Sequence, residues 1–231
     1  MKSWVLALIV SAGLAGSVGL AADPSISRLL SKLPPPEKFV DPAQNDPLAK
    51  QMFAAAKAHN FGTALEASRR LANKYPKSLG AHAVHGLIAL IMHRYPEASA
   101  AYRKALSIRP GFAPGYVGVA LAEASQNHFR EALSNFQRLT RLAPDADLGW
   151  IGSSASAEKL GMRQESLKYA RRATVVAPKS AGAWYQLARE EGLFGDKQVA
   201  ARALAQANRL QGSKPRMRPT RSSGGGSTQR R

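Results

Sequence analysis

The sequence contains no cysteine among its 231 residues. This absence excludes disulfide bonds, cysteine metal sites, thiol catalysis and an acylated N-terminal cysteine. Stability therefore has to come from packing alone. A composition with 45% hydrophobic and 21% charged residues is typical of a globular chain that has enough material for a core.

Acidic residues are scarce, with 15 Asp and Glu against 33 Lys and Arg, which gives a net charge of +18. Even without Lys2 and the six basic residues of 213–231, the chain has 26 basic against 15 acidic residues. Such an excess favours anionic partners, and it is equally compatible with simple solvation of a basic surface.

Catalytic motifs are missing as well. No phosphate-binding glycine loop, serine elbow or zinc-binding helix is present. His82 and His85 lie three residues apart, but no carboxylate or third imidazole accompanies them at ligand spacing, which favours satisfied or partly exposed histidines over a metal site. Adjacent Glu190 and Glu191 point in different directions on a helix and do not form an acid–base pair. We therefore expect no catalytic, cofactor or metal site, and a protein that is not an enzyme.

The N-terminus has the pattern of an export signal. Residues 1–21 begin with one charge at Lys2, continue with an uncharged apolar run and end in small residues. This pattern predicts a signal peptide cleaved after Ala21 or Ala22 and a periplasmic or secreted protein. The alternative is an uncleaved membrane anchor, because the run approaches the roughly 20 residues that span a bilayer.

Composition divides the remainder into three parts. Residues 22–44 are predicted to form a proline-rich linker that contains a short amphipathic helix, with apolar residues at Ile26, Leu29, Leu30 and Leu33. Residues 45–212 are compatible with helix almost throughout. Residues 213–231 are rich in Gly, Ser and basic residues and are predicted to be a disordered tail.

A repeat organises the helical part. Pro76, Pro110, Pro144 and Pro178 each close a similar phrase and are spaced by 34 residues. Small and large residues recur with them, at Gly86, Ala98, Tyr102 and Ala105, at Tyr116, Ala120, Ala132 and Phe136, at Trp150, Ser154, Ser166 and Ala173, and at Trp184, Ala188, Ala200 and Ala207. This pattern resembles the tetratricopeptide repeat family, whose units are helix-turn-helix pairs. His82 stands where one aromatic is usual.

The resemblance implies an all-α fold, a right-handed solenoid of about five repeats. Small residues are expected to let helices approach closely while aromatics fill the gaps between repeats. The last repeat carries an apolar stripe with no further amphipathic helix to cover it. Either this alanine-rich stripe tolerates exposure, or a partner or a second copy caps it. The stripe consists of Val199, Ala203, Leu204, Ala207 and Leu210.

The resemblance also implies a concave groove lined by the first helix of each repeat. Its predicted protein-binding residues are Ala49, Ala83, Val117, Ile151 and Tyr185, and one turn further Phe53, Leu87, Leu121, Ala155 and Arg189. Only Arg189 could serve in a clamp for a peptide carboxylate, so we expect an apolar groove for a peptide or an amphipathic helix. The alternative is that part of this lining packs against the neighbouring repeat.

A basic column is predicted on the opposite, convex surface. Arg70, Lys104, Arg138 and Arg172 recur every 34 residues, accompanied by Arg69, Arg103 and Arg171. The function predicted is thus an exported, non-catalytic scaffold that binds a protein partner in assembling an envelope complex. The alternative is an electrostatic binder of nucleic acid, phospholipid or lipopolysaccharide through this column and the tail, whose anion-binding candidates are Lys214, Arg216, Arg218 and Arg221.

Overall fold

The computed structural model describes residues 41–212, so the predicted signal peptide, the amphipathic segment and the basic tail lie outside the described residues. Within this range the chain forms a 3-10 turn, η2, and ten α-helices. Their bounds are η2 Pro42–Asn45, α3 Pro47–Lys57, α4 Phe61–Lys74, α5 Leu79–Ile91, α6 Tyr95–Ile108, α7 Ala113–Ser125, α8 Phe129–Leu142, α9 Asp147–Lys159, α10 Arg163–Val176, α11 Ala181–Phe194 and α12 Lys197–Gly212.

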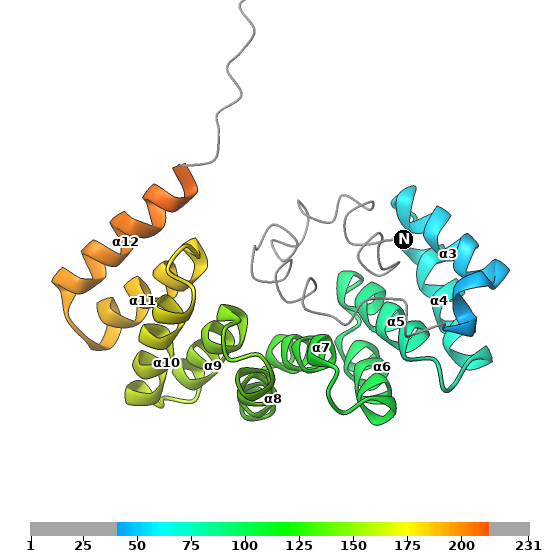
Figure 1. Ribbon diagram of the computed structural model, residues 1–231, viewed down its shortest axis with the longest axis horizontal. Coiled ribbons are helices and arrows are strands. Elements are labelled where there is room, and N and C mark those ends of the chain that lie inside the picture. The colour runs from blue at the N-terminus through cyan, green and yellow to red at the C-terminus, as the bar shows by residue number, and fades with distance from the viewer. Residues whose placement is uncertain (1–40, 213–231) are drawn as a thin grey trace, which may run out of the picture.

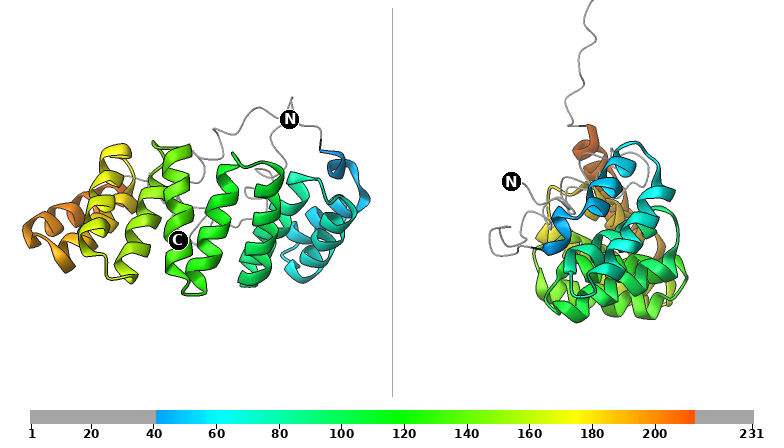
Figure 2. Two further views of the ribbon diagram at one scale, coloured as in Figure 1. Left: turned by 90° about the horizontal axis from the view of Figure 1, so that it is seen from below. Right: turned by 90° about the vertical axis from the view of Figure 1, so that its right-hand side faces the viewer.

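The helices pair into five units, numbered 1 to 5, each made of a first and a second helix: α3–α4, α5–α6, α7–α8, α9–α10 and α11–α12. Each helix packs on its neighbours in the chain, and neighbouring first helices of units 2 to 5 also contact each other. Consecutive units follow an arc whose two ends are α3 and α12 (Figure 1), with the helices side by side along it (Figure 2). The all-α solenoid predicted from the sequence is confirmed.

The prolines end the second helices as expected. α4, α6, α8 and α10 each stop two residues before the repeating proline, at Lys74, Ile108, Leu142 and Val176. The residue directly before a proline is disfavoured in the helical conformation, because its backbone clashes with the proline ring. The next first helix then begins after a short turn, capped by the Ser78 hydroxyl at α5 and by the Ser180 hydroxyl at α11.

The turn inside units 1 to 4 uses a second periodic signal. His59, His93, Asn127 and Gly161 have positive φ values of 57, 56, 63 and 74 degrees, and they too are spaced by 34 residues. Glycine adopts this left-handed conformation without steric cost, whereas histidine does so only occasionally. The backbone conformation of this residue is therefore the same in units 1 to 4 although the residue type changes, whereas the equivalent Gly195 of unit 5 has a φ of -127 degrees.

The contacts between units depend on matched side-chain sizes. The ring of Tyr102 in α6 lies between Gly86 of its own unit and Gly118 of unit 3; a Cβ atom on Gly86 would sit 2.8 Å from the ring, and one on Gly118 closer still. Phe136 packs in the same way against Gly152 of unit 4. The expected close approach of helices at small residues is thus made by rings and glycines together.

The three positions of this contact vary in concert along the chain. From the first interface to the fourth they hold Met52, Ser68 and Val84, then Gly86, Tyr102 and Gly118, then Ala120, Phe136 and Gly152, then Ser154, Ala170 and Gln186. At the second and third interfaces a large central residue stands between small ones, and at the first and fourth a small central residue has at least one larger residue beside it. Each interface is therefore filled, as close packing requires, although no single residue type recurs.

Candidate protein-binding face

The first helices form the inner side of the arc. Their direct contacts with one another show that they are closer together than the second helices, and α6 and α8 lie outside α5 and α7 in Figure 1. A partner that binds along the arc from the inside therefore meets one first helix per unit.

The first predicted groove column is largely used by the fold itself. Ala49, Ala83 and Val117 are buried. Ala49 belongs to a cluster with Leu71 of α4, and Ala83 to one with Phe112. The structure thus places these three side chains in the packing between helices. Ile151 and Tyr185, in the same column, remain partly exposed.

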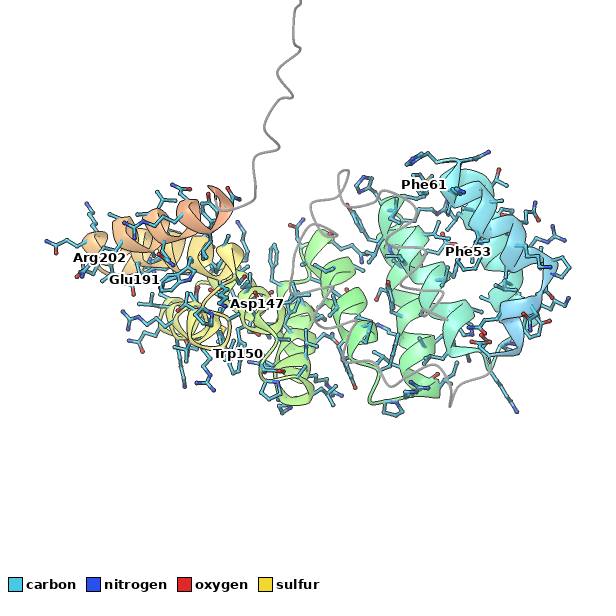
Figure 3. All side chains as sticks on the ribbon, turned by 45° about the horizontal axis from the view of Figure 1, so that its top comes forward. Phe53, Phe61, Asp147, Trp150, Glu191 and Arg202 are labelled. Carbon is cyan, nitrogen blue, oxygen red and sulfur yellow. The ribbon has the colours of Figure 1, made fainter. Side chains whose placement is uncertain are left out.

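The second predicted column stays accessible. Phe53, Leu87, Leu121 and Ala155 are half-buried, and the three larger side chains pack against the core clusters of their units on one side. Phe53 lies in the half of the arc opposite to Trp150 (Figure 3). The inner side thus carries one partly exposed apolar side chain per unit across units 1 to 4.

Arg189, the only predicted clamp cation, is engaged. Its guanidinium Nη2 donates to Glu158 Oε1 of unit 4 at 2.7 Å. This hydrogen bond raises the pKa of Arg189. The charge is balanced within the fold, which leaves no free cation among the ten predicted groove positions of the described chain.

Sequence reasoning missed a third apolar position on the inner helices. One further turn along, Ile91 is half-buried and Leu193 is 56% exposed. The signal was available, because the 34-residue period connects these two residues with Lys57, Ser125 and Lys159. Three of the five residues in this column are polar, so it did not stand out as an apolar stripe.

The early aromatic position of the repeat has a single structural role. His82 Nε2, Tyr116 Oη, Trp150 Nε1 and Trp184 Nε1 each donate to the carbonyl oxygen of the repeating proline six residues earlier, at 3.0, 3.0, 2.9 and 2.8 Å. His82 therefore replaces the aromatic in function as well as in place. It is a structural histidine, and so is His85, whose Nδ1 lies 3.0 Å from the Ser68 hydroxyl.

The basic residues of the second helices fall into two groups. Arg70, Lys104, Arg138 and Arg172 are exposed, and the guanidinium groups of Arg138 and Arg172 lie over the rings of Tyr116 and Trp150. Their expected companions are different. Arg69, Arg103 and Arg171 reach across to the next unit and bind Glu97, Glu123 and Glu191 at 2.7, 2.9 and 2.8 Å. These three arginines hold units together, which the sequence analysis did not foresee.

Glu123 shows the strength of these contacts. Burial favours its neutral form, but hydrogen bonds from Ser99, Arg103 and His128 outweigh this effect and lower the pKa of Glu123 to about 2. The carboxylate thus joins the second helix of unit 2 to the first helix of unit 3.

The interface between units 4 and 5 combines an apolar cluster, in which Ala170 of α10 packs with Leu187 of α11, with a polar network. Ser166 of α10 donates to the Glu190 carboxylate of α11, Gln186 donates to the same carboxylate at 2.8 Å, and Ser154 of α9 receives a second hydrogen bond from Gln186 at 3.1 Å. Burial raises the pKa of Glu190; the Ser166 hydrogen bond lowers it, and nearby Glu158 raises it further. Glu191 instead binds Arg171, so these two adjacent carboxyl groups have separate structural partners.

One open hollow of about 430 Å³ lies beside α8, lined by Arg130, Leu133, Ser134, Gln137, Leu160 and Met162.

Among residues 41–212 no three His, Cys, Asp or Glu side chains gather as a metal site. Within the same range no helix is both long and apolar enough to cross a bilayer.

Together these features support a helical-repeat fold of the tetratricopeptide type. The structure is similar to a crystal structure of MamA, with a TM-score of 0.65 and 14% identity over 73% of this chain and 96% of that chain. It is also similar to MamA from residue 41 to the end from Desulfovibrio magneticus RS-1, with a TM-score of 0.66 and 14% identity over 76% and 98% of the two chains. At this identity the likeness concerns the fold. No protein-family model matches the sequence, and neither does any curated protein.

Proposed function

We propose that this protein is a non-catalytic scaffold that binds an amphipathic helix or an extended apolar segment of a protein partner along the inner side of its arc. The observation that carries the proposal is the second groove column. Phe53, Leu87 and Leu121 are each held by their unit's core on one side and remain partly exposed on the other. Rigid, half-buried apolar side chains lose little entropy when a partner covers them.

The geometry of the column suits a helix. Packed helices lie about 8 to 10 Å apart, so successive units present their apolar residue at roughly that spacing. Seven residues of an α-helix rise about 10.5 Å. A partner helix with apolar residues at heptad spacing would therefore meet one exposed side chain per unit.

Photo-crosslinking tests this proposal. A photoreactive phenylalanine analogue in place of Leu87 is expected to trap the partner in the native compartment, and the Leu121→Glu change in the same chain is expected to abolish that adduct. The matched control places the analogue at exposed Lys104 on the outer side. Equal recovery of the same adduct with and without Leu121→Glu, in a chain that keeps its helical signal, would refute binding at this face.

The same proposal includes export and a role in assembling an envelope complex, for which residues 1–21 are the support. Sequencing of the N-terminus of the protein recovered from the producing cells is expected to begin at Ala22 or Asp23. A chain that retains Met1 in the membrane fraction would instead establish the anchor alternative.

A second candidate, binding of an anionic polymer or membrane surface, is favoured by how the fold uses its few carboxylates. Six acidic side chains are buried, at Asp41, Asp46, Glu123, Asp147, Glu190 and Glu191. By contrast, no Lys or Arg of residues 41–212 is buried. The surface is therefore more basic than the composition indicates, and the column Arg70, Lys104, Arg138 and Arg172 is exposed on it.

Binding to vesicles of anionic lipid and to a single-stranded oligonucleotide tests this candidate. Changing Lys104 and Arg138 to Glu should weaken binding to both ligands. Binding of the wild type should also weaken as salt is raised, because exposed charges are screened. Affinity that is unchanged by the reversal, by salt and by removal of residues 213–231 would dismiss it. The inner-side variant Leu121→Glu serves as the control that should bind as the wild type does.

A further inference from the structure

The outward face of α12 is the one second-helix face of the described chain that no following unit covers. The stripe predicted on this helix divides in two: Ala203 and Ala207 are buried within unit 5, while Leu204 is 44% exposed. Figure 3 shows Arg202, the neighbour of Leu204 in the chain, at this end of the arc.

Leu204 occupies the central position of the three-residue contact between units. Its equivalents at intervals of 34 residues are Ser68, Tyr102, Phe136 and Ala170, which are exposed by 0, 6, 3 and 0%. Each of those residues is covered by the first helix of the next unit. Within its own unit, Leu204 has Ala188 at the position equivalent to Gly86, which contacts Tyr102. On the side of the next unit, no residue of 41–212 is equivalent to Gly118.

The rest of the face repeats the pattern. Ala201 and Asn208 are exposed, and Asn208 Oδ1 accepts a hydrogen bond from Tyr185 Oη of its own unit at 2.6 Å. Their equivalents Leu133 on α8 and Thr174 on α10 are buried, and Leu167 and Thr140 at the same positions are half-buried. Lys197, Ala201, Leu204 and Asn208 are spaced so that they lie along one side of the helix. Ala201, Leu204 and Asn208 thus occupy positions that are buried or half-buried in the internal units, whereas the position of Lys197 is half-buried or exposed there, at Phe61, Tyr95, Phe129 and Arg163.

We propose that this face, defined by Lys197, Ala201, Leu204 and Asn208, binds an acidic amphipathic helix of a partner protein, in addition to and independently of the inner side. The charge supports this choice of partner. α12 carries Lys197, Arg202 and Arg209 and no acidic residue. Within the chain, arginines of second helices bind carboxylates of the next unit in three places, Arg69–Glu97, Arg103–Glu123 and Arg171–Glu191. The equivalent position of α12 holds Ala205, and the positive charges of this helix have no acidic residue of the described chain opposite them on this face.

Other occupants from this chain are disfavoured by charge. Residues 26–33 carry Arg28 and Lys32 without an acid, and residues 213–231 carry six basic residues without an acid. In a second copy, α12 is itself cationic, and the open face of α3 presents Lys50 and Lys57. All of these would bring positive charge against Lys197, which opposes binding.

Two stapled helical peptides of about four turns test the proposal on the full chain. Both carry the same Leu and Ala stripe; one has Glu on its flanks and the other has Lys. Fluorescence anisotropy is expected to show binding of the Glu peptide and none of the Lys peptide. Leu204→Arg should weaken binding of the Glu peptide about tenfold or more. Leu142→Arg is the matched control, because Leu142 is 48% exposed on α8, and it should bind as the wild type does.

A charge reversal adds a second readout. Lys197→Glu should weaken the Glu peptide and allow the Lys peptide to bind. The inner-side variant Leu121→Glu should leave both results unchanged, so that failure here is distinguishable from failure of the proposed function. No binding of the Glu peptide, or equal binding of both peptides, would overturn the proposal. A wild-type oligomer that Leu204→Arg alone dissociates would show that a second copy covers the face instead. Binding of the Glu peptide only after residues 26–33 or 213–231 are deleted would show that this segment of the chain covers it.

Discussion

The packing between units can be tested by replacing the three matched residues of the second interface, Gly86, Tyr102 and Gly118, with those of the first. Gly118→Val introduces a branched side chain where even a Cβ atom would overlap the Tyr102 ring, and we expect a cost of about 1–3 kcal/mol from overpacking. Tyr102→Ser empties the same space, and loss of a buried ring costs about 3–5 kcal/mol. For a chain of this size each kcal/mol corresponds to about 2–4 °C in Tm.

The combination of Gly86→Met, Tyr102→Ser and Gly118→Val reproduces the residues that Met52, Ser68 and Val84 provide at the first interface. Because the substitutions fill each other's space, we expect the triple variant to be more stable than the sum of the single effects by at least about 2 kcal/mol. Urea and thermal unfolding followed by circular dichroism measure this difference. Additive effects would refute the reasoning that the three sizes are matched.

Three further substitutions have defined outcomes. Ser153→Val should stabilise the fold by about 1 kcal/mol, measured as a rise in the urea midpoint. The reason is that the fully buried Ser153 hydroxyl has no hydrogen-bond partner, and the equivalent residue of unit 3 is Val119. Tyr116→Phe should cost about 1 kcal/mol in the same assay by removing the hydrogen bond to the Pro110 carbonyl. Folding lowers the pKa of Glu123 from 4.5 to about 2. Its contribution to the free energy of unfolding is therefore present above pH 4.5 and is lost as the pH falls toward 2. The Tm of Glu123→Gln should depend less steeply on pH in this window than the Tm of the wild type.

Much of the fold could be predicted because the 34-residue period is carried by prolines and by small residues, whose effects on the backbone and on helix approach are local. The accessible inner column, Phe53, Leu87 and Leu121, followed from the same register. The burial of Ala49, Ala83 and Val117 did not, because a small apolar residue fits an open face and a tight contact equally well.

The contacts of the charged residues were also beyond prediction. Arg103 and Arg171 recur at the repeat spacing, which suggested a solvent-facing column, but their carboxylate partners recur only at Glu123 and Glu191. Between Glu123 and Glu191, the same spacing places Ala157 instead of a carboxylate. Between Arg103 and Arg171, it places Gln137 instead of an arginine. Only the structure shows that the positions pair across units.

Matched sizes at the interfaces also decide which unit the chain can lose. Without residues 113–146, Tyr102 would face Gly152, the residue that accommodates Phe136 now, and the shortened arc would still close with a ring against a glycine. Without residues 79–112, Ser68 would face Gly118 and leave a void. The length of this solenoid is thus adjustable in its middle and constrained near its N-terminal end, so changes in its reach are confined to particular joints.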